Sequence, residues 1–535
     1  MFAAKKLQGA GGAGGAPTWD LDYAYYDDPY GGDVSTASYV NKNFNTDPQT
    51  VSTVTAIGFK PDGTIMYCGN NNGTLFQYTL SRAWDVTSAS YASKSKNLSA
   101  ETNDLYGPSF DPSGTKMYVT KSGGKTVYQY SLSTAWDIST ASYASKSYTL
   151  GSENLIANGV SFSPDGAKMF VPAYSNITQH NLSTPWDIST ASYASKSYSW
   201  SAQDTSAGCA GFSPDGKKMY MGGGVGDDIN YYTLSTAWDV TTASYVNRFS
   251  YASQTATAFS FYVRPDLGGF YVYSSVSFVG RVYQYAMGGF SVAAQDATPW
   301  NISVKPDGTA MYLMGNASDT VYQYTLGTAW DLSTASYASK NKSVTSQDSL
   351  PRGLFFKPDG TKMFTVGTSS DQVYRYALST AWDLSTANFE IGQAFSVSSQ
   401  ETSPQSIAFN SDGTKMYVVG TGSDTVFQYT LSTAWNLTTA SYASKSLSVS
   451  AKETTPFGLA FNDAGTVLFV CGNTSDSVHE YALSTAWDVS TGVFSKSFST
   501  GLDGPTGIFF KPDGSKFFLS DYVSHAIFTY SIGNQ

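Results

Sequence analysis

The residue types most often used for catalysis or metal binding are scarce in this sequence. It contains only three histidines, His180, His479 and His525, and three cysteines, an odd number that sets up no disulfide framework. Each histidine replaces one residue of a repeated pattern, which favours a structural role. The sequence shows no Ser-His-Asp order of a known type, no HExxH motif and no Cys/His cluster. It therefore predicts a non-enzymatic protein with no catalytic residues, no metal site and no cofactor.

Acidic residues at repeated positions are the main candidates for a binding surface. One set lies just before the expected first strand of a repeat, and another lies in the turn before the third strand. If the repeats are propeller blades, both sets fall on the same face. That face is a hypothetical site for Ca²⁺ or a basic partner, and turn capping with solubility is the alternative explanation. These acids are Asp204, Asp296, Asp348, Glu401, Glu453, Asp319, Asp371, Asp424 and Asp476.

A Trp-Asp pair recurs in seven repeats, and an eighth repeat has Trp435-Asn436 in its place. Tryptophan could stack on a sugar while the aspartate forms hydrogen bonds, but occurrence in nearly every repeat favours a structural role. We expect the tryptophan to fill a gap beneath each blade and the aspartate to cap the following turn. The tryptophans are Trp84, Trp136, Trp186, Trp238, Trp330, Trp382, Trp435 and Trp487.

The elements that must position these residues come from a repeat present ten times. A Pro-Asp-Gly motif or a variant of it recurs every 49 to 53 residues, apart from one interval of 41 between Pro265 and Pro306. Alternating apolar residues before the motif predict a strand with one buried face, and Pro-Asp-Gly predicts a tight turn. A Met-containing strand, a Tyr-containing strand and a polar edge strand follow. Four such strands repeated radially indicate an all-β propeller of ten four-stranded blades.

The way the ring closes is predicted from the two ends of the repeat array. The last repeat lacks a fourth strand after residues 527–532, and residues 33–44 supply a spare one. The preferred prediction is therefore a single ring closed by pairing these two segments. The alternative is two five-bladed rings that divide near Met287, because the Trp-Asp segment is missing there. In that case residues 33–44 close the first ring and residues 290–294 close the second.

Charge and hydropathy limit the kinds of binding partner that the chain can have. The net charge of −10 repels phosphate backbones, which argues against nucleic acid, and no apolar run is long enough to span a membrane. Residues 1–16 contain Lys5 and Lys6 ahead of a Gly/Ala stretch, which predicts a flexible tether or anchor before a propeller over residues 17–535. No signal peptide is evident.

The repeats, with SPDGTKMYV-like segments followed by TVYQYTLSTAWDLSTASY, resemble the YVTN and TolB-like propellers and the propeller proteins of marine tailed phages and aquatic bacteria. The resemblance implies a phage virion protein of the tail, fibre or capsid surface. Such a protein would bind other virion proteins through its N-terminal segment, and a host receptor or glycan through a loop face. The alternative is a bacterial cell-surface adhesin or carbohydrate-binding propeller outside the cell. A propeller lactonase or lyase is the least favoured class, because such enzymes need metal ligands in the channel.

Overall fold

The computed structural model describes residues 21, 24–26, 33–34, 37–46, 49 and 54–532, apart from 103–104, 122–123, 154–155, 206, 224–225, 256–257, 266–268 and 277–278. These residues form strands, turns and short 3₁₀ helices. The tether predicted for residues 1–16, including Lys5 and Lys6, lies outside the described residues. None of the described segments is a helix long and apolar enough to cross a bilayer.

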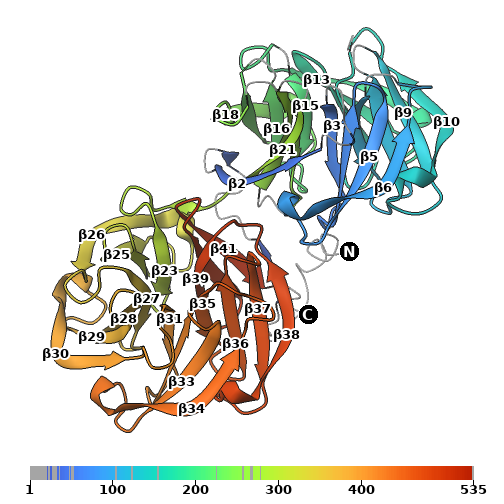
Figure 1. The fold of residues 1–535 in the computed structure, drawn as a ribbon. Helices are drawn as coiled ribbons and strands as arrows, with labels where there is room; N and C mark the ends of the chain where they lie inside the picture. The colour runs from blue at the N-terminus through green and yellow to red at the C-terminus, as the bar shows by residue number, and fades with distance from the viewer. Residues whose placement is uncertain are drawn as a thin grey trace. The chain divides into compact units, whose positions relative to one another are not determined.

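The chain divides into two compact units, each with five antiparallel sheets (Figure 1). The first unit contains residues 33–288, and the second combines residues 21–26 with residues 289–532. The single ring of ten blades is therefore wrong. The alternative division near Met287 lies next to the observed one between Gly288 and Gly289.

The first unit, blue to green in Figure 1, has a 3₁₀ turn before most fourth strands. These turns are η3 (Val86–Ser88), η4 (Ile138–Thr140), η5 (Ile188–Thr190) and η6 (Val240–Thr242). Its sheets are β3 (Val54–Phe59), β4 (Ile65–Asn70), β5 (Thr74–Leu80) and β6 (Ala89–Asn97); β7 (Leu105–Phe110), β8 (Lys116–Lys121), β9 (Thr126–Leu132) and β10 (Ala141–Thr149); β11 (Ser161–Phe162), β12 (Lys168–Pro172), β13 (Asn176–Leu182) and β14 (Ala191–Ser199); β15 (Ala207–Phe212), β16 (Lys218–Gly223), β17 (Asp228–Leu234) and β18 (Ala243–Ser250); β19 (Ala258–Val263), β20 (Gly269–Val276), β21 (Val279–Ala286) and β2 (Ser38–Asn45).

The second unit repeats this plan. Its 3₁₀ turns are η7 (Leu332–Thr334), η8 (Leu384–Thr386), η9 (Leu437–Thr439) and η10 (Val489–Thr491). Its sheets are β23 (Pro299–Val304), β24 (Ala310–Gly315), β25 (Thr320–Leu326) and β26 (Ala335–Ser343); β27 (Pro351–Phe356), β28 (Lys362–Gly367), β29 (Gln372–Leu378) and β30 (Ala387–Ser396); β31 (Pro404–Phe409), β32 (Lys415–Gly420), β33 (Thr425–Leu431) and β34 (Ala440–Ser448); β35 (Pro456–Phe461), β36 (Val467–Gly472), β37 (Ser477–Leu483) and β38 (Gly492–Ser499); β39 (Pro505–Phe510), β40 (Lys516–Asp521) and β41 (Ala526–Ile532) with β1 (Ala24–Tyr26) and β22 (Phe290–Ser291).

Each unit closes on itself after its fifth blade. In the first unit the ring of Phe59 on β3 lies 4.4 Å, centroid to centroid, from that of Tyr271 on β20. In the second unit Thr506 on β39 donates its hydroxyl to the carbonyl of Pro299 on β23 at 3.1 Å. The close fit of the inner strands has a visible cause: a Cβ at Gly507 would meet the Cα of Asn301 at 2.7 Å. Glycine at this position in three of the five inner strands, Gly353, Gly458 and Gly507, therefore allows the strands to pack closely around the axis.

The closing strands differ from the preferred prediction. Residues 33–44 do not pair with residues 527–532; β2 pairs with β21, inside the first unit. The last blade of the second unit takes its outer strand in two pieces, with β1 pairing along one half of β41 and β22 along the other. The alternative with two rings had assigned residues 33–44 and 290–294 to these closing roles.

This pairing makes the first propeller an insertion into the second. In the first blade of the chain the outer strand β6 is continuous, with Tyr91 opposite Tyr78 and Lys96 opposite Leu75. In the last blade Tyr26 and Phe290 take the corresponding places opposite β41. Four residues separate these places in β6, whereas in the last blade the whole first propeller intervenes.

The core of each blade comes from the repeated apolar positions. The large apolar residue that follows each Pro-Asp-Gly turn is fully buried in all ten sheets, and burial of such a side chain contributes roughly 1.5–3 kcal/mol. The turn itself packs on tryptophan. Gly63 has φ +74°, and a Cβ there would meet the Trp84 indole at 2.4 Å, so only glycine fits.

Candidate functional site

The Trp-Asp segments join neighbouring blades. The backbone N–H of Trp136 donates to the carbonyl of Gly114 in its own blade, and its carbonyl accepts from the Tyr67 hydroxyl of the preceding blade at 2.8 Å. Asp137 accepts from the N–H of Ser139 and caps η4. The N–H bond to the turn glycine and the positive φ recur at the other repeated tryptophans: Trp84, Trp186, Trp238, Trp330, Trp382, Trp435 and Trp487. A tyrosine hydroxyl also donates to the carbonyls of Trp84, Trp186, Trp382 and Trp487, whereas Lys168 and Arg375 donate to those of Trp238 and Trp435. These side chains therefore serve the joints between blades.

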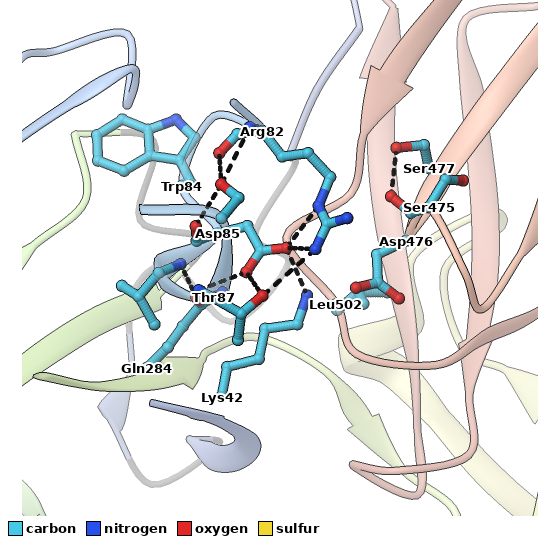
Figure 2. A network of polar contacts seen from close by, with 12 residues as sticks. Lys42, Arg82, Trp84, Asp85, Thr87, Gln284, Ser475, Asp476, Ser477 and Leu502 are labelled. Atoms are coloured by element: carbon cyan, nitrogen blue, oxygen red, sulfur yellow. Dashed lines mark hydrogen bonds and ion pairs between the residues drawn. The ribbon is translucent and has the colours of Figure 1, made fainter. Parts of the chain in front are cut away.

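Two polar groups missed in the sequence complete most of these joints. In the first unit, Asp85 accepts from Lys42 at 3.4 Å and from Nε of Arg82 at 2.7 Å, and Gln284 accepts from the N–H of Val86 at 3.2 Å (Figure 2). Together the two cations hold the pKa of Asp85 below its usual value against the opposing effect of burial. The lysine of each ASYASKS segment and the glutamine of each VYQY segment were the available sequence signals.

The repeated acids before each inner strand are buried. Asp296 and Asp348 are 3% and 2% exposed, and Glu401 and Glu453 are fully buried. Each of the four binds backbone N–H groups and hydroxyls of the loop before the third strand; Asp348, for example, accepts from Ser370 N at 3.1 Å. Asp204 of the first unit accepts similarly from Gly226. These carboxylates hold loops together.

The acids of the second set adopt left-handed backbone conformations in that same loop. Their φ values are +49° to +52°, and their backbone carbonyls accept hydrogen bonds, as from Val397 to Asp371 at 2.9 Å. Burial and the neighbouring acids raise the pKa of Asp319, Asp371 and Asp424. Asp476 belongs to the same set and is 6% exposed. No group of three or more His, Cys, Asp or Glu among the described residues could hold a metal ion.

The axis of the second propeller carries a cluster that repeat analysis did not find. The second residue of each inner strand differs from blade to blade: Trp300, Arg352, Gln405, Phe457 and Thr506. The adjoining positions repeat closely, so this variation within a regular pattern was the available signal.

Trp300 closes the axial end of this propeller. Its ring lies 5.0 Å from that of Phe457, on a strand that is not a neighbour of its own, so the indole crosses the axis. The ring of Tyr522, in the loop after β40, lies 5.9 Å from the Trp300 ring, centroid to centroid. One layer deeper, Asn301 donates to the Ser406 hydroxyl at 3.3 Å, again across the ring. Side chains therefore fill the axis of the second propeller at this end, and a ligand would contact the residues around Trp300.

The guanidinium of Arg352 lies over the Trp300 ring, and two of its nitrogens have no acceptor among the described residues. Its guanidinium carbon is 3.7 Å from the centre of the Trp300 ring. Nε and Nη1 of Arg352 and Nε1 of Trp300 are buried and have no acceptor among the described residues, and Gln405 Oε1 has no donor. Burial lowers the pKa of Arg352 to about 10 while Asp348 opposes the shift, so the group stays charged at pH 7. Buried N–H groups of this kind favour an anionic ligand.

Comparison with known proteins gives one match to a family. Residues 279–534, slightly less than half of the chain, match the sequence model of the family described as "Lactonase, 7-bladed beta-propeller". The matched stretch covers nearly all of the second propeller, which here has five blades. No curated protein matches the chain.

Solved structures match over most of this chain, but with low identities and low TM-scores. A protein described as a putative 6-phosphogluconolactonase from Bacteroides uniformis is 13% identical, with a TM-score of 0.29, and the match covers 69% of this chain and 92% of that one. A protein from Lactobacillus plantarum is 15% identical, with a TM-score of 0.28, over 73% and 97% of the two chains. A protein of unknown function from Desulfotomaculum acetoxidans is 12% identical, with a TM-score of 0.27, over 74% and 95%.

The family match corrects two predictions. The chain was expected to be a non-enzymatic phage virion protein, or alternatively a surface adhesin, and the match is instead to a family of enzymes. The expectation relied on repeat motifs that specify blades, and blades of this kind carry many functions. The propeller lactonases, ranked last because no metal ligands were seen, are the class that matches.

Proposed function

We propose that the second propeller is a lactonase-type hydrolase whose substrate carries a negatively charged group. The observation that carries the proposal is the charged guanidinium of Arg352, with Nε and Nη1 buried and without acceptors at the axial end. This cluster lies within residues 279–534, the stretch that matches the lactonase family.

The side chains around Trp300 supply the groups that would bind the substrate. A carboxylate or phosphate oxygen at Nε and Nη1 of Arg352 would satisfy both donors, and a hydrogen bond to a charged group contributes about 1.5–3 kcal/mol. Trp300 Nε1 offers a third donor and Gln405 Oε1 an acceptor for a hydroxyl. Phe457 and Tyr522, both partly exposed, present apolar surface beside them. Such a set suits a polar ring with an anionic substituent.

The reaction adds water to the lactone carbonyl and breaks the ring C–O bond to give a hydroxy acid. Negative charge develops on the carbonyl oxygen, and preorganised donors in a water-poor site stabilise it. The carboxylates of Asp348 and Glu401 already accept from loop N–H groups, and no group of acids, histidines or cysteines among the described residues fits a metal ion. We therefore assign no step to a metal.

The test compares six-membered sugar lactones that carry a phosphate, a carboxylate or neither, with hydrolysis followed by proton release. We expect the charged lactones to react at least tenfold faster, in kcat/KM, than the neutral one. Arg352→Met should remove that preference, whereas Arg248→Met, on the first propeller, should not. Equal rates for all three lactones, or no hydrolysis by the folded protein, would overturn the proposal.

A further inference from the structure

One blade of the second propeller places a histidine beside a partly exposed serine hydroxyl. Nε2 of His479 on β37 lies 2.7 Å from Oγ of Ser475, in the loop that precedes this strand. Nδ1 of the same ring lies 2.8 Å from Oγ of Ser497 on β38. His479 is only 3% exposed, while Ser475 is partly accessible. A hydroxyl in contact with a buried imidazole is the basic arrangement of a nucleophile and its base.

The other blades show that the structure does not require the histidine. The same position holds Tyr322, Tyr374 and Phe427 in the three preceding blades. The serine has counterparts such as Ser423, which donates to Glu401 at 2.7 Å as Ser475 donates to Glu453 at 2.6 Å. The hydrogen bond between a loop serine and a buried acid therefore occurs in more than one blade. Among the residues at the position of His479 in this propeller, the imidazole is found in this blade alone.

The surroundings of His479 favour its neutral form. Burial lowers the pKa of His479, although Glu453 opposes the shift. With its proton on Nδ1, the ring donates to Ser497 and leaves the Nε2 lone pair 2.7 Å from Oγ of Ser475. Glu453, 4.0 Å from Nε2, already accepts from the N–H groups of Thr455 and Thr474. In the resting structure the single hydroxyl proton of Ser475 goes to Glu453, and Nε2 of His479, 2.7 Å from the same oxygen, is a second acceptor within reach.

The loop of Ser475 also borders the axial cluster. Asn473 in this loop accepts from the Tyr522 hydroxyl at 3.5 Å, and the Tyr522 ring lies against Trp300. A ligand anchored on Arg352 over Trp300 would lie beside Tyr522 and the start of this loop. The nucleophile and the anion site therefore share one end of the second propeller.

We infer that Ser475 is the nucleophile for lactone opening and that His479 is its general base, an inference that rests on the proposed function. Oγ of Ser475 adds to the carbonyl carbon while its proton moves to Nε2 of His479. The ring C–O bond breaks, the leaving oxygen takes that proton, and an ester of Ser475 remains. Water hydrolyses the ester with His479 taking and returning a proton, so that a hydroxy acid is released. Water is the only co-reactant.

Four variants distinguish a catalytic role of Ser475 and His479 from a structural one. Ser475→Ala and His479→Phe should each lower kcat at least 100-fold with little change in KM. Phenylalanine is already present at the matching Phe427, so the fold accommodates it. Ser423→Ala removes the same kind of hydrogen bond from a blade without a histidine and should leave kcat within twofold. His479→Tyr, which introduces the side chain found at Tyr322, should be as inactive as His479→Phe.

A covalent readout distinguishes failure of this inference from failure of the proposed function. A fluorophosphonate should label Ser475 with loss of fluoride, and labelling should fall at least tenfold in His479→Phe, whether or not any lactone is a substrate. Acid quenching during turnover should leave a Ser475 ester visible in the intact mass. If lactone hydrolysis persists in Ser475→Ala, the nucleophile is wrong and the lactonase stands. If the probe leaves Ser475 unlabelled in the folded protein, the inference fails by itself.

Discussion

Tyr26 and Tyr530 are antiparallel partners in the last blade of the second propeller. The pair matches Tyr91 and Tyr78 in the first blade of the chain, and nearby Leu21 donates to Glu480 as Val86 donates to Gln284. The outer strand of this blade therefore begins before the first propeller and resumes at Phe290 after it.

This topology predicts that the first propeller can be removed. Deletion of residues 27–289, with Tyr26 joined to Phe290 by the sequence Ala-Ser-Lys-Ser copied from residues 92–95, restores an uninterrupted outer strand. We expect a soluble β-protein with one cooperative unfolding transition by circular dichroism. The same deletion without residues 1–26 should melt at a lower temperature, because half of the strand is absent. An unfolded or aggregated product from the first version would contradict the assigned insertion.

The buried glutamines should contribute more to the stability of the joints between blades than the surface ion pairs do. Gln428 is 2% exposed and accepts from the N–H of Val489 at 3.1 Å, so Gln428→Leu strands a buried donor at a cost of about 1–3 kcal/mol. Lys445 pairs with Asp488, but 40% of its side chain is exposed, and Lys445→Met should cost less than about 1 kcal/mol. Urea unfolding of the two variants measures the difference. A larger loss for Lys445→Met would reverse this order.

The bulge in five of the outer strands holds a strained serine. Ser93, Ser145, Ser195, Ser339 and Ser444 have φ values of +55° to +56°, where residues with a Cβ are disfavoured. The matching positions in two other blades are Asn41 and Gly392, residue types that tolerate this region. Ser444→Gly or Ser444→Asn should therefore stabilise the protein by a few tenths to about 1 kcal/mol. Thermal unfolding tests this, with Ser441→Gly, outside the bulge, expected to destabilise.

The ring of neighbouring carboxylates should make stability depend on pH. Burial and the charges of Asp348, Glu401 and Glu453 raise the pKa of Asp371 and Asp424 in the folded state. Each ionised carboxylate therefore opposes folding above its folded pKa, and the effect disappears below the unfolded pKa, where both states are protonated.

Asn tolerates the φ of +50° to +52° at these two positions, so Asp371→Asn with Asp424→Asn should raise the melting temperature at pH 7. The gain should shrink steadily towards pH 3. Asp383→Asn provides the opposite control. The lysine and serine contacts of Asp383 lower its pKa, so its stabilisation is present at neutral pH and lost in acid. A gain for the double variant that does not change with pH would contradict the electrostatic explanation.

Local sequence patterns predicted much of the fold. Alternating apolar residues, Pro-Asp-Gly turns and the Trp-Asp segment each act within one blade, so the strands and caps could be predicted without tertiary information. The burial of Met66 and its equivalents follows from the same periodicity. The acids before the inner strands, such as Glu453, were recognised as a set, but their burial depends on a loop about twenty residues further along.

Sequence by itself determined that the chain builds ten similar four-stranded sheets, because every signal for them lies within one repeat. Only the tertiary structure decided that they form two rings of five, since ring size depends on which inner strands meet around an axis. Gly507 against Asn301 and Thr506 against Pro299 are such contacts, and each joins residues about two hundred positions apart. The candidate site has the same origin, because Trp300, Arg352 and Phe457 come together only when those five strands close.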